Sequence, residues 1–303
     1  MLKKLFINFL LVAAVVAVLD FALGKVLRHF YFRESSGLHY RTTYSMEKAD
    51  ADILIFGSSR ANHHYVPEVF ADSLGLTFYN TGRDGNGIFY QAALLKSVLK
   101  RYTPKVIILD YAGDFGKGRQ VYDNLSSLLP YYQSHPEIRQ EVNLRSPYES
   151  VKLLSGIYPY NSQLLTIAVG NLDMNKKRKS DNKGYVPLET EHPVVKEYFN
   201  SLIQQPVDSN KIESLREFVR VAKASGTRFV VVYSPLYQEH KRYWEIEICE
   251  TICKEAGVPF WDYSRDSFFV QQPDLYYDPV HLNHKGALIF SKQIASRMRD
   301  VLH

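Results

Sequence analysis

From residue 52 onward the chain alternates short apolar runs with segments of helical period, and this alternation constrains the fold more than any other feature. It is typical of a mostly parallel sheet covered by helices on both faces. The runs predicted as strands are Ile53–Phe56, Thr77–Asn80, Val106–Leu109, Phe229–Tyr233 and Pro259–Trp261. The segments predicted as helices are Tyr90–Lys100, Ile212–Ala224, Glu239–Ala256 and Lys285–Val301. We therefore predict one α/β domain over residues 50–303.

Length and composition exclude disorder. The chain has 303 residues, 46% of them hydrophobic, which is enough to bury a full core. The net charge of +5 is modest, and its one dense basic run is Lys176–Lys179. Because that run lies among Asn, Asp, Ser and Gly, with no aromatic-and-basic motif, we interpret it as a solvated loop and expect no nucleic-acid partner. Cys249 and Cys253, four residues apart in a helix-like segment, are interpreted as two core thiols.

The alternation of strands and helices fails between residues 115 and 207. Tyrosine, proline and asparagine are frequent there, as in Tyr158–Asn161. We predict a largely helical insertion with long loops after the third strand. Because ligands of such sheets bind beyond the carboxyl ends of the strands, we expect the insertion to shape the substrate site.

The N-terminal segment is apolar from Leu5 to Leu23, with interruptions at Asn8 and Asp20. A membrane span needs about 20 residues. We therefore predict an uncleaved signal anchor over residues 1–24 and a stalk over residues 25–49. A cleaved signal peptide is the alternative, because the small residues around Gly24 resemble a cleavage site.

The orientation of this segment is not decided by its flanking charges. Basic residues precede it at Lys3 and Lys4, and others follow it at Lys25, Arg28 and Arg33. A short basic N-terminus before a single export-like helix still favours a globular part outside the cytoplasm. We expect a single-pass membrane protein whose domain is periplasmic or extracellular.

The first predicted strand is followed at once by Gly57-Ser58-Ser59. A strand that ends in glycine and small hydroxyl residues makes a tight turn at the edge of the sheet where ligands bind. A serine there presents its hydroxyl to the crevice, and backbone N–H groups of the next helix can stabilise an oxyanion. Taken alone, this pattern is also explained by a helix cap.

A second pattern near the C-terminus gives the serine a partner. Asp278 stands three residues before His281, and Pro279 stiffens the turn between them. This spacing lets the carboxylate orient the imidazole, and the imidazole can then accept the proton of Ser59. The sequence thus predicts a Ser59–His281–Asp278 catalytic triad.

The Gly57-Ser58-Ser59 block and the block from Asp278 to Phe290 resemble the first and last blocks of SGNH hydrolases, also called the GDSL family. The resemblance covers roughly residues 50–115 and 208–303. The Gly-Ser-Ser variant is similar to that of DltD and related envelope acyltransfer proteins. The resemblance implies a flavodoxin-like, three-layer α/β/α fold, a serine acyl-ester hydrolase or O-acetyltransferase activity, and no cofactor.

The resemblance also places the oxyanion hole. The loop after the second predicted strand carries Gly85, which matches the family's oxyanion glycine, so the backbone N–H groups of Ser59 and Gly85 are the expected donors. A nucleotide-binding loop is the rival, but the glycine spacing is not the dinucleotide fingerprint. We expect Arg60, Asn86 and Asp114 to contact substrate, although Arg60 could instead pair with an acid such as Asp84 or Asp114.

The SGNH family has a further sequence block after its third strand, and this chain departs from it there. The segment Asp110–Asp114 has no asparagine where the family has an oxyanion donor. Either another donor from the insertion, such as Asn124 or Asn161, replaces it, or activity is low. The missing donor would ordinarily contribute about 2.7–4 kcal/mol to transition-state stabilisation.

A metal site is a further alternative. His63 and His64 are adjacent, and His281 and His284 are three apart. Because no third clustered ligand accompanies them, we expect no metal and place His284 at the start of the last helix.

Two functions follow from these motifs. The first is a membrane-anchored serine esterase or O-acyltransferase that acts on an acylated cell-envelope glycan or another ester. The second is a catalytically weak SGNH-fold scaffold protein with envelope-assembly partners.

Overall fold

The computed structural model describes residues 1–111, 113–172, 174, 182–190, 194–198, 206–239 and 244–302. The basic run Lys176–Lys179, expected in a solvated loop, lies outside these described residues.

A five-stranded parallel sheet forms the centre of the domain. Its strands are β1 (Ile53–Gly57), β2 (Phe78–Asn80), β3 (Val106–Asp110), β5 (Arg228–Tyr233) and β7 (Phe260–Asp262). Their order in space is β2-β1-β3-β5-β7, which is the flavodoxin-like order. All five predicted strands are confirmed, with bounds shifted by a residue. The residues of β1 and β3 are all buried, as continuous apolar runs require when both faces of a sheet are covered.

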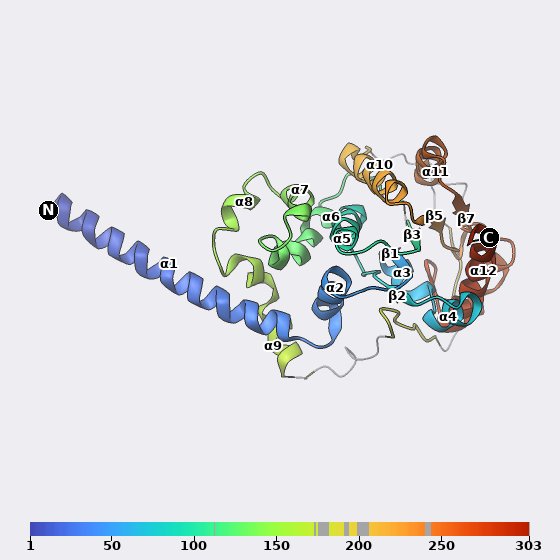
Figure 1. The fold of residues 1–303 in the computed structure, drawn as a ribbon, viewed down its shortest axis with the longest axis horizontal. Coiled ribbons are helices and arrows are strands. Elements are labelled where there is room, and N and C mark those ends of the chain that lie inside the picture. Colours follow the sequence, from blue (N-terminus) through green and yellow to red (C-terminus); the bar gives the residue numbers. More distant parts are fainter. Residues whose placement is uncertain are drawn as a thin grey trace.

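Helices cover the sheet in two layers (Figure 1). One layer contains α5 (Ile88–Leu99), α10 (Ser209–Ala224) and α11 (Trp244–Ala256); the other contains α3 (Ser59–His64), α4 (Pro67–Leu74) and α12 (His284–Leu302). Side chains of β1 alternate between the layers. Leu54 and Phe56 join the core under α5 and α10, whereas Ile53 and Ile55 join the core under α4 and α12. The predicted three-layer α/β fold is confirmed.

One helix begins later in the structure than the sequence predicts. Glu239, predicted as the first residue of a helix over Glu239–Ala256, instead lies in strand β6 (Gln238–Glu239), which pairs with β4 (Glu197–Tyr198). The helix itself begins at Trp244 in the described chain. Pairing with a distant segment overrides the local helical pattern at this point.

In the described residues, the insertion after β3 consists mainly of short helices, as the sequence predicts. Its α-helices are α6 (Gln120–Asp123), α7 (Arg139–Asn143), α8 (Glu149–Lys152) and α9 (Leu164–Asn171). Single-turn and longer 3₁₀ helices, such as Asn124–Tyr131, connect them. Pro130 lies inside that 3₁₀ helix, and prolines of this kind limit the length of α-helices.

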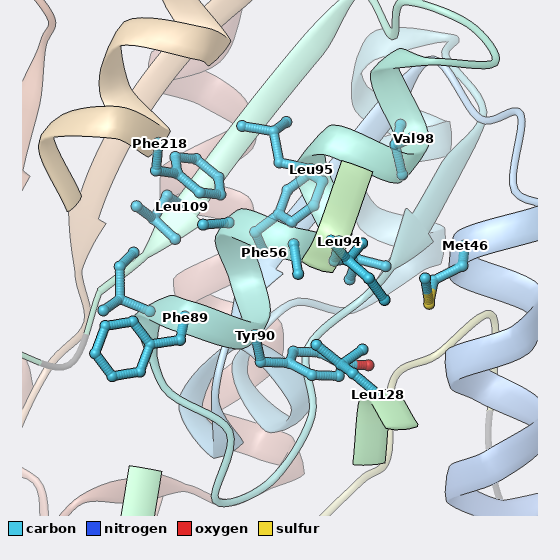
Figure 2. Close-up of a cluster of buried hydrophobic side chains, with 14 of the residues drawn as sticks. Met46, Phe56, Phe89, Tyr90, Leu94, Leu95, Val98, Leu109, Leu128 and Phe218 are labelled. Carbon is cyan, nitrogen blue, oxygen red and sulfur yellow. The ribbon is translucent and has the colours of Figure 1, made fainter. Parts of the chain in front are cut away.

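The N-terminal helix α1 (Leu2–Arg33) projects from the domain (Figure 1). It is long and apolar enough to cross a membrane. The stalk expected over residues 25–49 takes a different form, because α1 continues to Arg33 and residues 37–47 form α2 (Gly37–Glu47), which packs against α5. Figure 2 shows Met46 of α2 in the same cluster as Phe56 and Leu94.

The apolar pattern of the sequence does not indicate α2, because most of the buried side chains of this helix are polar. Arg41 is buried, and its guanidinium donates hydrogen bonds to the backbone carbonyls of Gly82 (2.9 Å) and Gly184 (2.8 Å). Thr42 and Thr43 are also buried, and their hydroxyls contact those of Tyr90 and Tyr131. Such partners compensate for burying polar side chains, so the segment packs without an apolar stripe.

Candidate active site

The candidate site lies where the strand order of the sheet reverses, between β1 and β3. Ligands of open α/β sheets bind in the crevice at this switch point. Two cavities, of about 400 Å³ and about 360 Å³, border Ser58 and Ser59. The larger extends along the Gly85 loop and the start of α5, and the smaller extends toward Tyr233 and His281.

Gly57 makes the sharp turn that presents the serine. Its φ of +149° favours glycine, and a Cβ at this position would lie 2.4 Å from the carbonyl oxygen of Asp110 and 2.6 Å from the Cβ of Ala61. The turn therefore brings β1 against β3 and starts α3 at Ser59. Ser58 stands at the cap position, but its side chain makes no capping hydrogen bond. The helix-cap explanation of the motif is thus not supported by the geometry.

The predicted triad residues meet in space. His281 Nε2 lies 2.7 Å from Ser59 Oγ, across 222 positions of sequence. His281 Nδ1 lies 2.8 Å from Asp278 Oδ2 and 3.0 Å from its Oδ1. Asp278 and His281 come from β8 (Tyr276–Asp278) and β9 (His281–Leu282), two short strands that pair antiparallel. This is the order of contacts that a serine nucleophile, its base and an orienting carboxylate require.

The turn between β8 and β9 holds Asp278 in its charged form. Burial alone would raise the pKa of Asp278, but hydrogen bonds from the His281 side chain and from the backbone N–H of Val280 outweigh this and lower it. The backbone N–H groups of Val280 and His281 both donate to Asp278 Oδ1 at 2.9 Å. A carboxylate fixed in this way keeps the proton of His281 on Nδ1 and leaves Nε2 free to face the serine.

His64 supports the strand that carries His281. Its Nε2 accepts a hydrogen bond from the backbone N–H of Leu282 at 2.9 Å, so this nitrogen carries no proton. The ring is fully buried, and burial, aided by the nearby His281 and Arg60, holds the pKa of His64 well below its usual range. From its sequence context, His64 is a candidate only for metal binding. No local pattern marks a residue whose partner is more than 200 positions away.

The Gly85 loop forms one wall of the larger cavity. Gly85 has a φ of +71° and lines the cavity together with Ser59 and Asn86. Asn80 anchors the loop, because its side-chain amide donates to the carbonyl of Ala61 (2.6 Å) and accepts from the N–H of Gly82 (2.9 Å). The structure therefore brings the expected oxyanion residues, Ser59 and Gly85, to one cavity.

The side chains considered as replacements for the missing third-block donor lie in different places. The Asn124 side-chain amide donates a hydrogen bond to the carbonyl oxygen of Gly85. Asn161 is an exposed residue of the 3₁₀ helix Tyr158–Gln163, which packs against α1 and α9. Asn124 therefore holds the Gly85 loop from the insertion, whereas Asn161 is not among the residues that line the two cavities.

Arg60 is buried beside the smaller cavity. Its guanidinium lies 4.2 Å from the ring centroid of Tyr233 and donates to the carbonyl of Tyr111 at 3.2 Å. Its acidic neighbour is Asp110, at 3.9 Å between Arg60 Nε and Oδ1, and not the Asp84 or Asp114 that the sequence suggested. Burial raises the pKa of Asp110, which also accepts a hydrogen bond from Tyr65 at 2.8 Å.

Asp114 lies at the mouth of the larger cavity. Its carboxylate accepts a hydrogen bond from Lys211 Nζ at 2.9 Å, and Lys211 also donates to the carbonyl of Gly116 at 2.8 Å. Lys211 is almost fully buried and lines the same cavity. The place of Lys211 in this cavity could not be predicted from sequence, because a single lysine at the start of an amphipathic helix carries no motif.

The other two histidines considered as metal ligands, His63 and His284, make contacts of other kinds. His63 Nδ1 lies 2.7 Å from the carbonyl of Val186, and its Nε2 lies 3.4 Å from Asp84 Oδ2. His284 is the first residue of α12, as expected, and its Nδ1 lies 2.8 Å from the hydroxyl of Tyr185.

Fold and site together define a three-layer α/β protein whose nucleophile-like serine faces a histidine and an aspartate from the other end of the chain. No family model matches this sequence. No curated protein matches it either.

Similar solved structures share only a low sequence identity with the chain. A proposed acylhydrolase of Bacteroides fragilis has a TM-score of 0.45 at 11% identity, covering 89% of this chain and 100% of that one. An acetyl xylan esterase has a TM-score of 0.41 at 12% identity, covering 83% of this chain and 100% of that one. The protein YxiM of Bacillus subtilis has a TM-score of 0.43 at 11% identity, covering 83% of this chain and 57% of that one. Because likenesses this distant carry no functional argument, the function is argued from the site itself.

Proposed function

We propose that the protein is a membrane-anchored serine esterase or O-acyltransferase that uses Ser59, His281 and Asp278. The observation that carries this proposal is the 2.7 Å contact between His281 Nε2 and Ser59 Oγ, with Asp278 behind the imidazole. An isolated serine hydroxyl is a poor nucleophile, and a neighbouring oriented base is what activates it.

In the first half-reaction Ser59 Oγ attacks the carbonyl carbon of an ester while His281 Nε2 takes the hydroxyl proton. The negative charge develops on the former carbonyl oxygen, and the backbone N–H groups of Ser59 and Gly85, which both line the larger cavity, would stabilise it. The tetrahedral intermediate collapses, the ester C–O bond breaks, and His281 returns the proton to the leaving alcohol. Ser59 is left acylated.

In the second half-reaction an oxygen nucleophile attacks the acyl-serine. His281 takes a proton from that nucleophile and passes it to Ser59 Oγ as the acyl group leaves. If the nucleophile is water, the protein is an esterase; if it is a sugar hydroxyl, the protein is an O-acyltransferase. The two cavities on either side of Ser59 would hold the acyl group and the alcohol.

We propose an acylated cell-envelope glycan as the substrate. The apolar helix α1 supports a membrane anchor, and an anchored enzyme suits a substrate that is itself held at the membrane. The short basic N-terminus before this helix favours a domain outside the cytoplasm. Gln91 and Lys211 give the larger cavity polar walls, as a hydroxyl-rich ligand requires. No cofactor enters either half-reaction.

The proposal is tested by turnover of p-nitrophenyl acetate with the full-length chain in detergent. We expect Ser59→Ala and His281→Ala each to lower the rate by about 10⁴-fold or more. The matched control Ser267→Ala changes an exposed serine that is not among the residues lining either cavity, and it should retain the rate. Equal rates in all four proteins would contradict the proposal.

That contradictory result would favour a scaffold protein with envelope-assembly partners. The observation that favours a scaffold is the departure from the family pattern after the third strand. Tyr111 and Asp114 line the larger cavity there, and no asparagine lies between them. An acyl-enzyme trapped on Ser59 and then offered water or a soluble glycan would separate the esterase from the transferase.

A further inference from the structure

A short segment of the insertion presents apolar side chains on the outside of the domain. Tyr148, Val151 and Leu154 are 68%, 63% and 82% exposed; Val151 lies in α8, Tyr148 directly before that helix and Leu154 two residues after it. Scattered exposed apolar residues are ordinary, but a group of three large ones on one short element is a candidate interaction surface.

The inner side of the same segment is charged and buried. Glu149 is fully buried, and its carboxylate accepts hydrogen bonds from Arg145 (2.7 Å) and Lys152 (3.2 Å) and from the hydroxyl of Tyr158. These contacts lock the segment with its acid inward and its apolar side chains outward. This is the reverse of the arrangement expected for a segment that faces water.

The segment is attached to α1 at one defined level. The hydroxyl of Ser155 and the N–H groups of Gly156 and Ile157 donate to the carboxylate of Asp20 at 2.6, 2.6 and 3.3 Å. One turn further on, Gly24 lies so close to Gly156 that a Cβ on Gly24 would be 2.4 Å from the Gly156 carbonyl carbon. The backbones of α1 and the insertion therefore touch at this point.

That level is where the apolar part of α1 ends. With a rise of about 1.5 Å per residue, the stretch Leu5–Leu23 is roughly 27 Å long, close to the thickness of a bilayer core of about 30 Å. The contacts at Asp20 and Gly24 therefore lie at the edge of the proposed span. They also supply Asp20 with hydrogen-bond donors that a lipid surface would lack.

Basic side chains follow on the next turns of α1. Lys25, Arg28 and Arg33 surround a surface hollow of about 460 Å³, together with His29 and Phe32. Lysine and arginine just beyond an apolar span suit the phosphate layer of a bilayer, because their stems stay in the apolar region while their charges reach the headgroups.

We propose that Tyr148, Val151 and Leu154 insert into the surface of the same bilayer that α1 crosses. The protein would then contact the membrane at two places, and the domain would be held at a fixed height and tilt. Figure 1 shows α8 on the side of the domain from which α1 projects. A bilayer is favoured over a protein partner because the segment is attached to α1 at Asp20 and Gly24, where the apolar stretch of α1 ends and its basic turns begin. This inference rests on the proposed span of α1 and is independent of the proposed chemistry.

The test uses the full-length chain in vesicles of phosphatidylethanolamine and phosphatidylglycerol. Single cysteines replace Leu154, Val151, Val12 or Phe268 and are labelled with an environment-sensitive fluorophore, while the native Cys249 and Cys253 are buried. Val12 lies within the span, and Phe268, which is 42% exposed next to the 3₁₀ helix Phe269–Gln271, is the matched apolar control. Thermal unfolding confirms that each variant is folded.

We expect the labels at positions 154, 151 and 12 to be quenched by lipids with a doxyl group on the acyl chain and shielded from aqueous iodide. The label at position 268 should show the opposite behaviour. A label at 154 that iodide quenches as strongly as the one at 268, while the label at 12 is shielded, would overturn the proposal and retain the span. Shielding of position 154 only after membrane proteins are added would also overturn it, in favour of a protein partner. Neither result depends on esterase turnover.

Discussion

At the scale of single residues, the site combines groups that sequence motifs reveal with groups that they do not. Ser59, Asp278 and His281 could be predicted because each lies in a short local pattern, and the structure brings them together. His64 and Lys211 could not, because their partners are the N–H of Leu282 and the carboxylate of Asp114, which are distant in sequence. A contact formed only by folding leaves no local signature.

Asp278→Asn tests the orienting role of the carboxylate. Because an asparagine amide can donate to the imidazole, it would favour the tautomer with the proton on Nε2, and that nitrogen could no longer accept from Ser59. We expect kcat/KM for p-nitrophenyl acetate to fall by about 10⁴-fold while the fold is retained. A loss below tenfold, with an unchanged Tm, would show that Asp278 does not orient His281.

His64→Gln tests the buried support of β9 through pH. In the unfolded chain His64 has a pKa of about 6.5, whereas burial holds its pKa in the folded protein well below that value. Below about pH 6.5 the unfolded state therefore binds a proton that the folded state does not, so the free energy of unfolding falls as the pH falls. This one group contributes a slope of at most about 1.4 kcal/mol per pH unit.

Glutamine keeps an acceptor for the Leu282 N–H but does not titrate. We expect denaturant unfolding at pH 7.5, 6.5 and 5.5 to show a smaller loss of stability for His64→Gln than for the natural chain. Parallel pH dependence in the two proteins would mean that His64 does not titrate differently on folding.

At the scale of secondary-structure elements, apolar periodicity located the five strands of the sheet and the helices α5, α10 and α12. It failed where tertiary contacts override local pattern. The start of the predicted helix at Glu239 is taken up by β6, and the polar helix α2 packs through buried hydrogen bonds of Arg41 rather than through an apolar stripe. Local period predicts elements that bury apolar side chains, and it misses elements held by polar ones.

Gly57→Ala tests the turn between β1 and α3. The added Cβ would lie 2.4 Å from the Asp110 carbonyl oxygen, and the residue would have to keep a φ of +149°. We expect the free energy of unfolding to drop by roughly 2–4 kcal/mol, with loss of turnover as Ser59 moves. The control is Gly75→Ala, whose φ is +65° but whose Cβ would meet no atom within 4 Å. Its cost should be only about 1–2 kcal/mol, and equal losses in the two variants would contradict the proposed crowding.

At the scale of the whole molecule, the segment before β1 is part of the fold. Tyr31 at the end of α1 and Met46 in α2 are buried in the main core, although the sequence suggested a stalk there. Sequence pattern alone could not show this, because Tyr31 lies in a short run between Arg28 and Arg33, and Met46 lies in a polar segment. Helix α1 and the domain are thus joined by packing and not by a spacer.

Shortened chains test this joint. A chain that begins at residue 25 keeps Tyr31 and Met46, whereas one that begins at residue 48 loses both. Removing a large buried side chain costs about 2–5 kcal/mol, so we expect the Tm of the shorter chain to be lower by roughly 10 °C or more. Similar Tm values for the two chains would show that residues 25–47 do not contribute to the core.

The central claim, that a histidine near the C-terminus activates a serine near the N-terminus, is tested most directly by a fluorophosphonate, which reacts covalently with activated serines. The full-length protein is treated with the reagent and digested, and the modified peptide is located by mass spectrometry. We predict one adduct, on Ser59. It should disappear in Ser59→Ala and form about 100-fold more slowly, or slower still, in His281→Asn. An unmodified Ser59, or modification at the same rate without His281, would contradict the account.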